Sequence, residues 1–203
     1  MKMKRAWVVA IGLCAGHGIA ASQPVAEKPD WKVGDRWEFR QSTTPGDQST
    51  TWSRQITELL PENRIRVKFG NGTLEQYDAA FNFIPDGRAE FIRILAQYPL
   101  KVGDQWTYTR KFANPALEET GTAKVVAYES ITVPAGTFDC YRVDIDASFN
   151  NKQYSEQRLW QRWYCPKVKW IAKERLETRV FQPRSPGTTT VASSELAKFT
   201  PGE

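Results

Sequence analysis

The segment Lys32-Val33-Gly34-Asp35-Arg36-Trp37-Glu38-Phe39 returns later in the chain as Lys101-Val102-Gly103-Asp104-Gln105-Trp106-Thr107-Tyr108. Both copies follow the pattern K-V-G-D-x-W-x-aromatic. Glycine can take the positive φ of a tight turn, and aspartate can hydrogen-bond the backbone that follows it. Tryptophan and the aromatic residue two positions later share one face of an extended strand. The repeat therefore predicts two copies of one unit, a tight turn that leads into a strand.

Strand-like segments follow each copy of the repeat, joined in pairs by a proline-containing turn: 51–60 with 64–69, and 122–131 with 137–145. In Arg64–Phe69, apolar residues alternate with basic ones, which is typical of an antiparallel strand with one face in the core. No long helical pattern occurs outside the N-terminus. We therefore predict an all-β fold of antiparallel sheets, built from two related β-meander modules that form a sandwich or a partly open barrel.

The same pattern gives the expected organisation of the chain. Residues 22–97 form the first module and residues 98–199 the second, with one shared core. Val191–Phe199 is expected to be a last strand against Lys173–Gln182, after a loop over residues 184–190. Residues 200–203 are expected to be frayed.

The N-terminus has the three parts of a secretory signal peptide over residues 1–21. A basic head, Met1–Arg5, precedes an apolar run, Ala6–Cys14, and small residues end at a cleavage point between Ala21 and Ser22. The apolar run is about half of the roughly 20 residues that span a bilayer. We expect a cleaved, periplasmic protein without a transmembrane segment in its mature chain. Leu13 precedes Cys14 where a lipobox has a small residue, which argues against lipidation.

Cleavage changes the charge and the cysteine count. The signal holds three basic residues and no acid, so the net charge of +5 falls to +2. The charges are interspersed, which does not favour nucleic acid as a partner. Cys140 and Cys165 remain as an even pair, which in an oxidising compartment most often forms a disulfide; two buried free thiols are the alternative.

A direct bridge between neighbouring antiparallel strands would fix their register. Opposed positions would then include Tyr141 with Tyr164, Val143 with Arg162 and Ile145 with Trp160 on one face, and Arg142 with Trp163 and Asp144 with Gln161 on the other. The register sorts the apolar residues onto the first face and leaves the bridge on the more polar one. A one-residue slip would scramble the two faces.

The apolar face of this hairpin is also the predicted ligand-binding site. It combines Arg158 and Arg162 with Trp160 and Tyr164. In one interpretation the arginine stems pack while their charged heads reach the rim or stack on Trp160. In the other, both arginines face a cleft or a barrel mouth and bind the carboxylate or phosphate of an amphipathic ligand.

Catalytic chemistry is narrowly limited. The only histidine, His17, lies in the signal, so the mature chain lacks histidine-based acid–base, nucleophilic and metal sites. We predict no catalytic residues, no metal site and no cofactor. A carboxylate-based hydrolase would need two acids such as Asp144, Asp146 or Glu156, whose spacing is not diagnostic.

Residues 131–143, I-T-V-P-A-G-T-F-D-C-Y-R-V, carry a further pattern. It resembles exported bacterial β-domains of unknown function that carry V-P-A-G-T-F-x-C-x-x-V after P-L-x-x-G-x-x-W, here Pro99–Trp106. Those families continue with Y-x-P-G-V-G, where this chain has Tyr164–Lys169 with lysines in place of both glycines. The resemblance covers about residues 98–182. It implies a curved antiparallel fold in the cell envelope and brings no catalytic residues.

These observations predict a periplasmic, non-enzymatic binding or interaction protein for an amphipathic or lipid-like envelope component. Two alternatives remain: a structural or assembly partner that recognises an envelope protein through a sheet edge, and the carboxylate hydrolase. The ligand or partner itself is not identified by the sequence.

Overall fold

A computed structural model describes residues 24–46, 48–84, 96–112, 117–150, 154–182 and 185–203. The predicted signal peptide, residues 1–21, lies outside the described residues. The strands are β1 (Arg36–Thr44), β2 (Gln48–Leu60), β3 (Arg64–Phe69), β4 (Leu74–Tyr77), β5 (Phe83–Ile84), β6 (Gln105–Lys111), β7 (Glu118–Val133), β8 (Gly136–Asn150), β9 (Ser155–Cys165), β10 (Trp170–Gln182) and β11 (Ser185–Thr200). A short 3-10 helix, η3 (Pro166–Val168), separates β9 from β10. No helix in the described part of the chain has the length and apolar character needed to cross a membrane.

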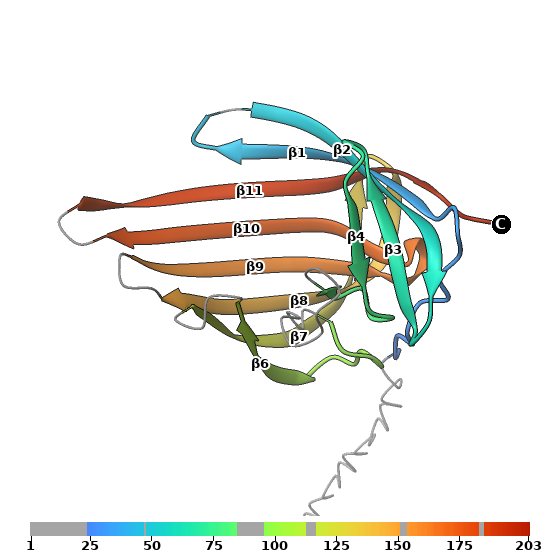
Figure 1. The fold of residues 1–203 in the computed structure, drawn as a ribbon, viewed down its shortest axis with the longest axis horizontal. Coiled ribbons are helices and arrows are strands. Elements are labelled where there is room, and N and C mark those ends of the chain that lie inside the picture. The colour runs from blue at the N-terminus through green and yellow to red at the C-terminus, as the bar shows by residue number, and fades with distance from the viewer. Residues whose placement is uncertain (1–23, 47, 85–95, 113–116, 151–153, 183–184) are drawn as a thin grey trace, which may run out of the picture.

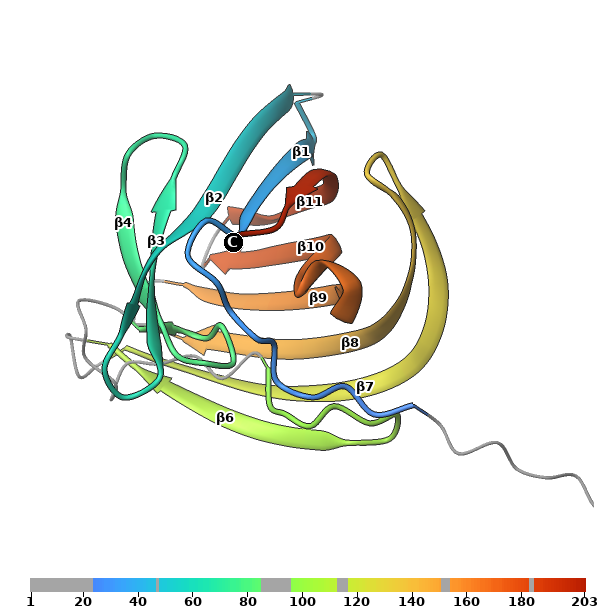
Figure 2. The same ribbon diagram turned by 90° about the vertical axis from the view of Figure 1, so that its right-hand side faces the viewer.

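All strands belong to one antiparallel sheet of 11 strands, in the order β5-β4-β3-β2-β1-β11-β10-β9-β8-β7-β6. Each module is a meander, β1 to β5 and β6 to β11, and β1 pairs with β11 to join them. The central strands lie side by side while β3 and β4 run across one end of them (Figure 1). Seen from that end, the sheet curls into an open barrel-like shape, and β7 and β8 are its strongly curved strands (Figure 2). The predicted all-β, two-meander fold is confirmed.

The sequence repeat is also a structural repeat. Gly34 N–H donates to Ile56 O at 2.8 Å, and Gly103 N–H donates to Val125 O at 2.9 Å. Both glycines have positive φ, 96° and 99°. In each case the strand whose carbonyl accepts the glycine N–H has a β-bulge just after that carbonyl. The bulge lies between Ile56 and Glu58 in β2 and after Val125 in β7. Bulges bend a strand, so the two modules share their curvature as well as their turn.

The core is one cluster that draws on both modules. Trp37 and Ile56 of the first module are fully buried, and Tyr141 and Ile145 of the second are at most 2% exposed. We call the face of the sheet that carries these side chains the inner face, and the opposite face the outer face. Alternation along each strand then assigns the neighbouring residues to one face or the other.

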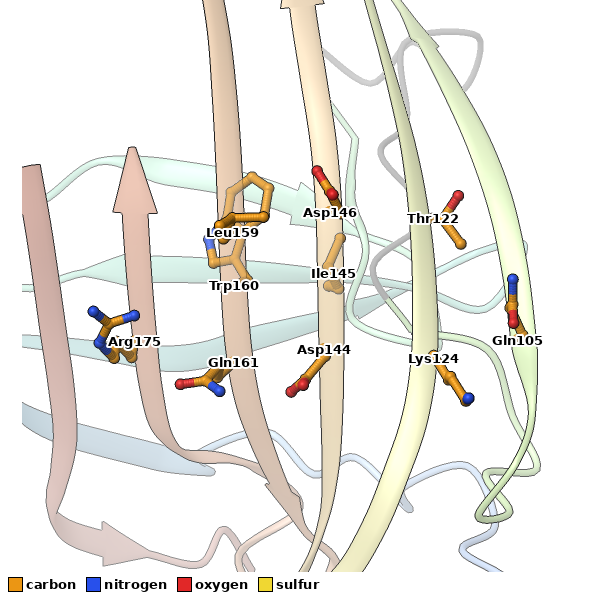
Figure 3. A pocket seen from close by; sticks show the side chains of 10 residues that line it. All are labelled: Gln105, Thr122, Lys124, Asp144, Ile145, Asp146, Leu159, Trp160, Gln161 and Arg175. Atoms are coloured by element: carbon orange, nitrogen blue, oxygen red, sulfur yellow. The ribbon is translucent and has the colours of Figure 1, made fainter. Parts of the chain in front are cut away.

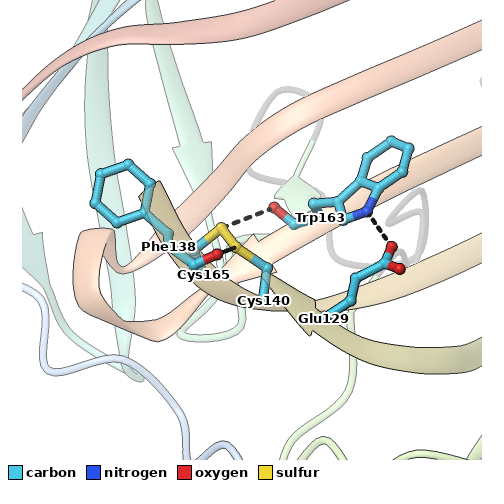
Figure 4. The surroundings of a disulfide bond; sticks show 5 residues. All are labelled: Glu129, Phe138, Cys140, Trp163 and Cys165. Atoms are coloured by element: carbon cyan, nitrogen blue, oxygen red, sulfur yellow. Dashed lines mark hydrogen bonds between the residues drawn. A yellow bond between two sulfur atoms is a disulfide. The ribbon is translucent and has the colours of Figure 1, made fainter. Parts of the chain in front are cut away.

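The predicted hairpin register is correct in every pair. Tyr141 lies opposite Tyr164, Val143 opposite Arg162 and Ile145 opposite Trp160. The predicted disulfide joins Cys140 and Cys165, whose Cα atoms are 4.2 Å apart. The bridge is fully buried. Beside it on the outer face, Trp163 Nε1 donates to Glu129 Oε1 at 2.7 Å (Figure 4).

The C-terminal segment differs from expectation at two places. Residues 185–190, which we predicted as loop, form the first part of β11, where Thr188, Thr189 and Thr190 pair with β10. The loop was predicted from Ser185, Pro186 and Gly187. The three threonines that follow are β-branched, and such residues favour a strand where a partner strand is available. Residues 200–203 were expected to be frayed, yet Gly202 N–H donates to Asp35 Oδ1 at 2.9 Å.

Asp35 joins three distant segments. Its buried carboxylate accepts hydrogen bonds from Lys32 N–H in the first turn and from Gly202 N–H, and it pairs with Lys169 Nζ at 2.9 Å. Lys169 follows η3 with a left-handed backbone, φ 58°, which is the geometry that glycine favours. The turn therefore forms with a lysine in the left-handed region, and the lysine side chain gains an ion pair.

We predict that Asp35→Asn lowers the free energy of unfolding by about 2–3 kcal/mol, because it leaves a partly buried ammonium without its counter-charge. The matched control is Asp104→Asn, at the same position of the second turn, where the carboxylate accepts from Lys101 N–H and makes no ion pair with a described residue. Urea denaturation of the mature chain measures both variants. Equal destabilisation by the two substitutions would show that the turn, and not the Lys169 pair, is what matters.

A double-mutant cycle isolates the role of Lys169. Lys169→Gly relieves about 1 kcal/mol or more of left-handed strain but leaves the buried Asp35 carboxylate without its counter-charge, so by itself it should destabilise the protein, by less than Asp35→Asn does. In the Asp35→Asn background the pair is already lost, and Lys169→Gly is expected to stabilise the protein. Destabilisation by Lys169→Gly in both backgrounds would contradict the ion-pair account.

Reduction of Cys140–Cys165 is expected to cost roughly 3 kcal/mol, because the bridge closes a loop of moderate length in the unfolded chain. For a domain of this size the midpoint of thermal unfolding should fall by roughly 6–12 °C. The Cys140→Ala, Cys165→Ala double variant should unfold at the same lowered temperature with and without reductant. Thiol titration of the denatured, non-reduced mature chain should find no free thiol.

Candidate functional site

The candidate site is a small pocket of about 50 Å³ on the inner face, between β9, β10, β11, β1 and β2. Its polar lining is Trp52, Arg54, Arg162, Glu174 and Ser194, and Phe39, Trp170 and Ile171 form its apolar wall. The sheet register explains part of this arrangement. Arg162 pairs with Glu174 across β9 and β10, and Glu174 pairs with Ser194 across β10 and β11, so the three stand in one row.

Arg54 stands among aromatic rings. Its guanidinium carbon lies 4.6 Å from the ring centre of Trp52 and 5.1 Å from that of Trp170. Phe69, Phe81 and Phe39 lie at 5.3, 5.5 and 5.9 Å. These distances suit cation–π attraction. Burial lowers the pKa of the Arg54 guanidinium below its usual value, while Tyr77 and Glu174 oppose that shift.

Arg162 reaches the pocket from the other side. Its side chain is 9% exposed, and its Nε lies 2.8 Å from Glu174 Oε2 as an ion pair, without the alignment of a hydrogen bond. Its guanidinium carbon lies 5.6 Å from the Trp170 ring, so Trp170 contacts both arginines. The pocket thus brings two cations and one carboxylate together, and both cations share the Trp170 indole.

Unsatisfied polar atoms collect at this pocket. In the described part of the chain, four buried side-chain polar atoms have no hydrogen-bond partner: Trp52 Nε1, Arg54 Nε, Arg162 Nε and Ser194 Oγ. All four belong to residues that line the pocket. Buried polar groups are nearly always paired, and leaving one unpaired costs about 1–3 kcal/mol. Four of them around one cavity indicate a place that a polar ligand or water occupies.

The sequence-predicted site residues are divided by the structure. Arg162 lines the pocket. Trp160 lies two residues away on the same face and is buried. Tyr164 packs edge-on against Tyr98 with ring centres 5.3 Å apart, and burial raises the pKa of its hydroxyl to about 12. Neither of these two aromatic residues lines the Arg54–Arg162 pocket.

Arg158 belongs to a separate acidic cluster. It pairs with Glu119 at 3.0 Å and with Glu156, and the Tyr108 hydroxyl donates to the fully buried Glu119. Among the described contacts, Arg158 therefore lies between two carboxylates that supply its counter-charge. Its guanidinium carbon also lies 5.9 Å from the Trp160 ring, as the stacking interpretation expected.

Arg54 and Trp52 are missing from the sequence-based prediction. Both lie in β2, two positions apart and therefore on one face, opposite Trp37 and Phe39 of β1. The available signal was this register, because it places an arginine directly across from the repeat tryptophan.

A larger hollow lies elsewhere. A groove of about 580 Å³ is lined by a row of polar residues that includes Gln105, Lys124, Asp144, Gln161 and Arg175, one from each of five neighbouring strands (Figure 3). These side chains stand on the outer face. Asp144 is already paired with Arg142 at 2.7 Å. Leu159 also lines the groove, and none of the lining residues has an unsatisfied buried polar atom among those found in the described structure.

The three carboxylates considered for hydrolysis do not converge. Asp144 and Asp146 stand on the outer face, whereas Glu156 stands on the inner face with Arg158. In the described residues no group of three or more His, Cys, Asp or Glu side chains is placed to hold a metal ion.

Comparison with known proteins gives a family match and distant structural likenesses. A family model described as DUF3108-like matches residues 109–178. A comparison with curated proteins finds no match. A protein of Parabacteroides distasonis ATCC 8503, described as a lipoprotein, shares 15% identity with a TM-score of 0.47, over 88% of this chain and 100% of that one.

Two further solved structures show a similarly low sequence identity and TM-score. A protein described as exported, with a YmcC-like fold, from Bacteroides fragilis NCTC 9343 has 13% identity and a TM-score of 0.48 over 87% of this chain and 100% of its own. The hypothetical lipoprotein YmcC from Escherichia coli (K12) has 8% identity and a TM-score of 0.45 over 82% and 85%. Over residues 109–178, which include Arg158 and Arg162 but not Arg54, the chain is similar to the DUF3108-like family.

Proposed function

We propose that this protein is a non-enzymatic binding protein of the cell envelope that holds an amphipathic, lipid-like component on the inner face of its sheet. The observation that carries the proposal is the Arg54–Arg162 pocket, where four buried polar atoms lack partners beside a wall of aromatic rings. A ligand with one polar end and one apolar part would satisfy the polar atoms and cover the rings.

A place for the apolar part adjoins the pocket. Leu176 follows Glu174 by two positions on β10, and Ala192 precedes Ser194 by two on β11, so both share the inner face with the pocket. Both side chains are partly exposed. Leu176 also lies opposite Trp160 of β9. We call Trp160, Leu176 and Ala192 the apolar lane; it extends from the pocket along the sheet.

The envelope setting is supported by the sequence of residues 1–21, which has the form of a secretory signal, and by the buried Cys140–Cys165 disulfide. The absence of histidine from the mature chain and the separation of the candidate carboxylates favour binding over catalysis.

The proposal predicts saturable binding of an uncharged apolar fluorophore, N-phenyl-1-naphthylamine, to the purified mature protein. Leu176→Glu puts a charge into the apolar lane and should weaken this binding at least about tenfold, which corresponds to about 1.4 kcal/mol. Leu74→Glu is the matched control, because Leu74 is 58% exposed on β4. Fluorescence titration measures all three proteins. No saturable uptake by the wild type, or equal loss in both variants, would refute the proposal.

A further inference from the structure

We propose that the Arg54–Arg162 pocket recognises a carboxylate, so that the ligand is a long-chain carboxylic acid. This inference rests on the proposed function and specifies the polar end of the ligand.

The first argument is the type of the unsatisfied atoms. Trp52 Nε1 and both arginine Nε atoms carry hydrogens and act purely as donors, and Ser194 Oγ also has a hydrogen to donate. A carboxylate is acceptor-only, with two oxygens and about four lone-pair sites. Three unpaired donors, together with Arg162 Nε, which lies 2.8 Å from Glu174 Oε2 without an aligned hydrogen bond, therefore meet a group that accepts about four hydrogen bonds. An amine or an ammonium group would bring more donors into a site that already has an excess of them.

The second argument is charge. The lining holds the cations Arg54 and Arg162 and the anion Glu174, which leaves one positive charge without a counter-ion inside the pocket. Tyr77 and Glu75 also act on Arg54, but neither lines the pocket. A single negative charge restores neutrality. A phosphate monoester carries about −1.5 to −2 at neutral pH, which exceeds that balance.

The third argument is size and surroundings. A cavity of about 50 Å³ accommodates a group of a few heavy atoms, while the rest of the ligand must lie outside it. The apolar lane begins two residues from Glu174 and Ser194, so an alkyl chain can continue directly from the pocket. Charge-assisted hydrogen bonds from arginine to a carboxylate are strong and directional, and they gain further strength where aromatic walls exclude water.

The test compares four ligands with the same dodecyl chain and different heads, each displacing N-phenyl-1-naphthylamine from the mature protein below micelle-forming concentrations. Dodecanoate should displace the fluorophore at a concentration at least about thirtyfold lower than dodecanol, because of its charge-assisted hydrogen bonds. Dodecyltrimethylammonium should bind more weakly than dodecanol. Dodecyl phosphate should bind more weakly than dodecanoate.

Single-donor variants keep the fold and the charge while removing one contact. Trp52→Phe and Ser194→Ala should each weaken dodecanoate about fivefold and leave dodecanol unchanged. Ser193→Ala is the matched control, because Ser193 is the adjacent residue on the outer face and pairs with Arg175. Arg54→Met should abolish the preference for dodecanoate over dodecanol, with circular dichroism to verify that the variant is folded.

The outcomes separate the two proposals. Absence of fluorophore uptake refutes the binding function itself. Uptake with equal displacement by dodecanoate and dodecanol refutes the carboxylate inference and leaves the binding function standing. Preference for dodecyl phosphate also overturns the inference, as does a dodecanoate affinity that neither Trp52→Phe nor Ser194→Ala changes.

Discussion

The pairing of β1 with β11 is the contact on which the whole sheet depends, because among the described strands it is the pairing that joins one meander to the other. Asp35 stands at the end of this seam and ties its turn to Lys169 and to Gly202. A Cβ added to Gly202 would lie 2.3 Å from Val33 O, so a larger residue at position 202 would clash with the backbone of the first turn. The candidate pocket spans the same seam, with Arg54 from the first meander and Arg162 from the second. Neither meander contains the pocket alone.

Local patterns predicted what depends on local chemistry. The K-V-G-D-x-W repeat specified the two turns, since glycine and aspartate have intrinsic backbone preferences there. The cysteine pair specified the register of β8 and β9 through one covalent constraint. The pocket could not be predicted in the same way. Trp52 and Glu174 are far apart in sequence and meet through the β1–β11 seam, which no local pattern encodes. Arg54 sits where composition would favour an apolar residue, because arginine is rarely buried.

An arginine whose buried Nε has no hydrogen-bond partner among the described residues is costly for folding, and the rings around Arg54 offset part of that cost. Each cation–π contact contributes about 0.5–2 kcal/mol, whereas the desolvation of a charge costs several kcal/mol. The second arginine, Arg162, forms an ion pair with Glu174, but its Nε has no aligned hydrogen bond. The Ser194 hydroxyl, next in the same row, has no hydrogen-bond partner among the described residues. Such preorganised donors bind a matching group with little rearrangement, because the side chains are already ordered. The acidic cluster around Arg158 is the contrasting case, where the protein supplies the counter-charges itself.

The strand order also bears on how the chain reaches this structure. Arg36 of β1 pairs with Thr200 of β11, so the two strands of this pairing are separated by most of the polypeptide. Synthesis delivers β1 early and β11 last, and contacts of such long range form slowly. Until then the first meander has a free edge at β1, with unpaired N–H and C=O groups that can template pairing with another chain. Until β11 pairs, that edge is open to other chains, and a chain truncated before β11 would keep it exposed.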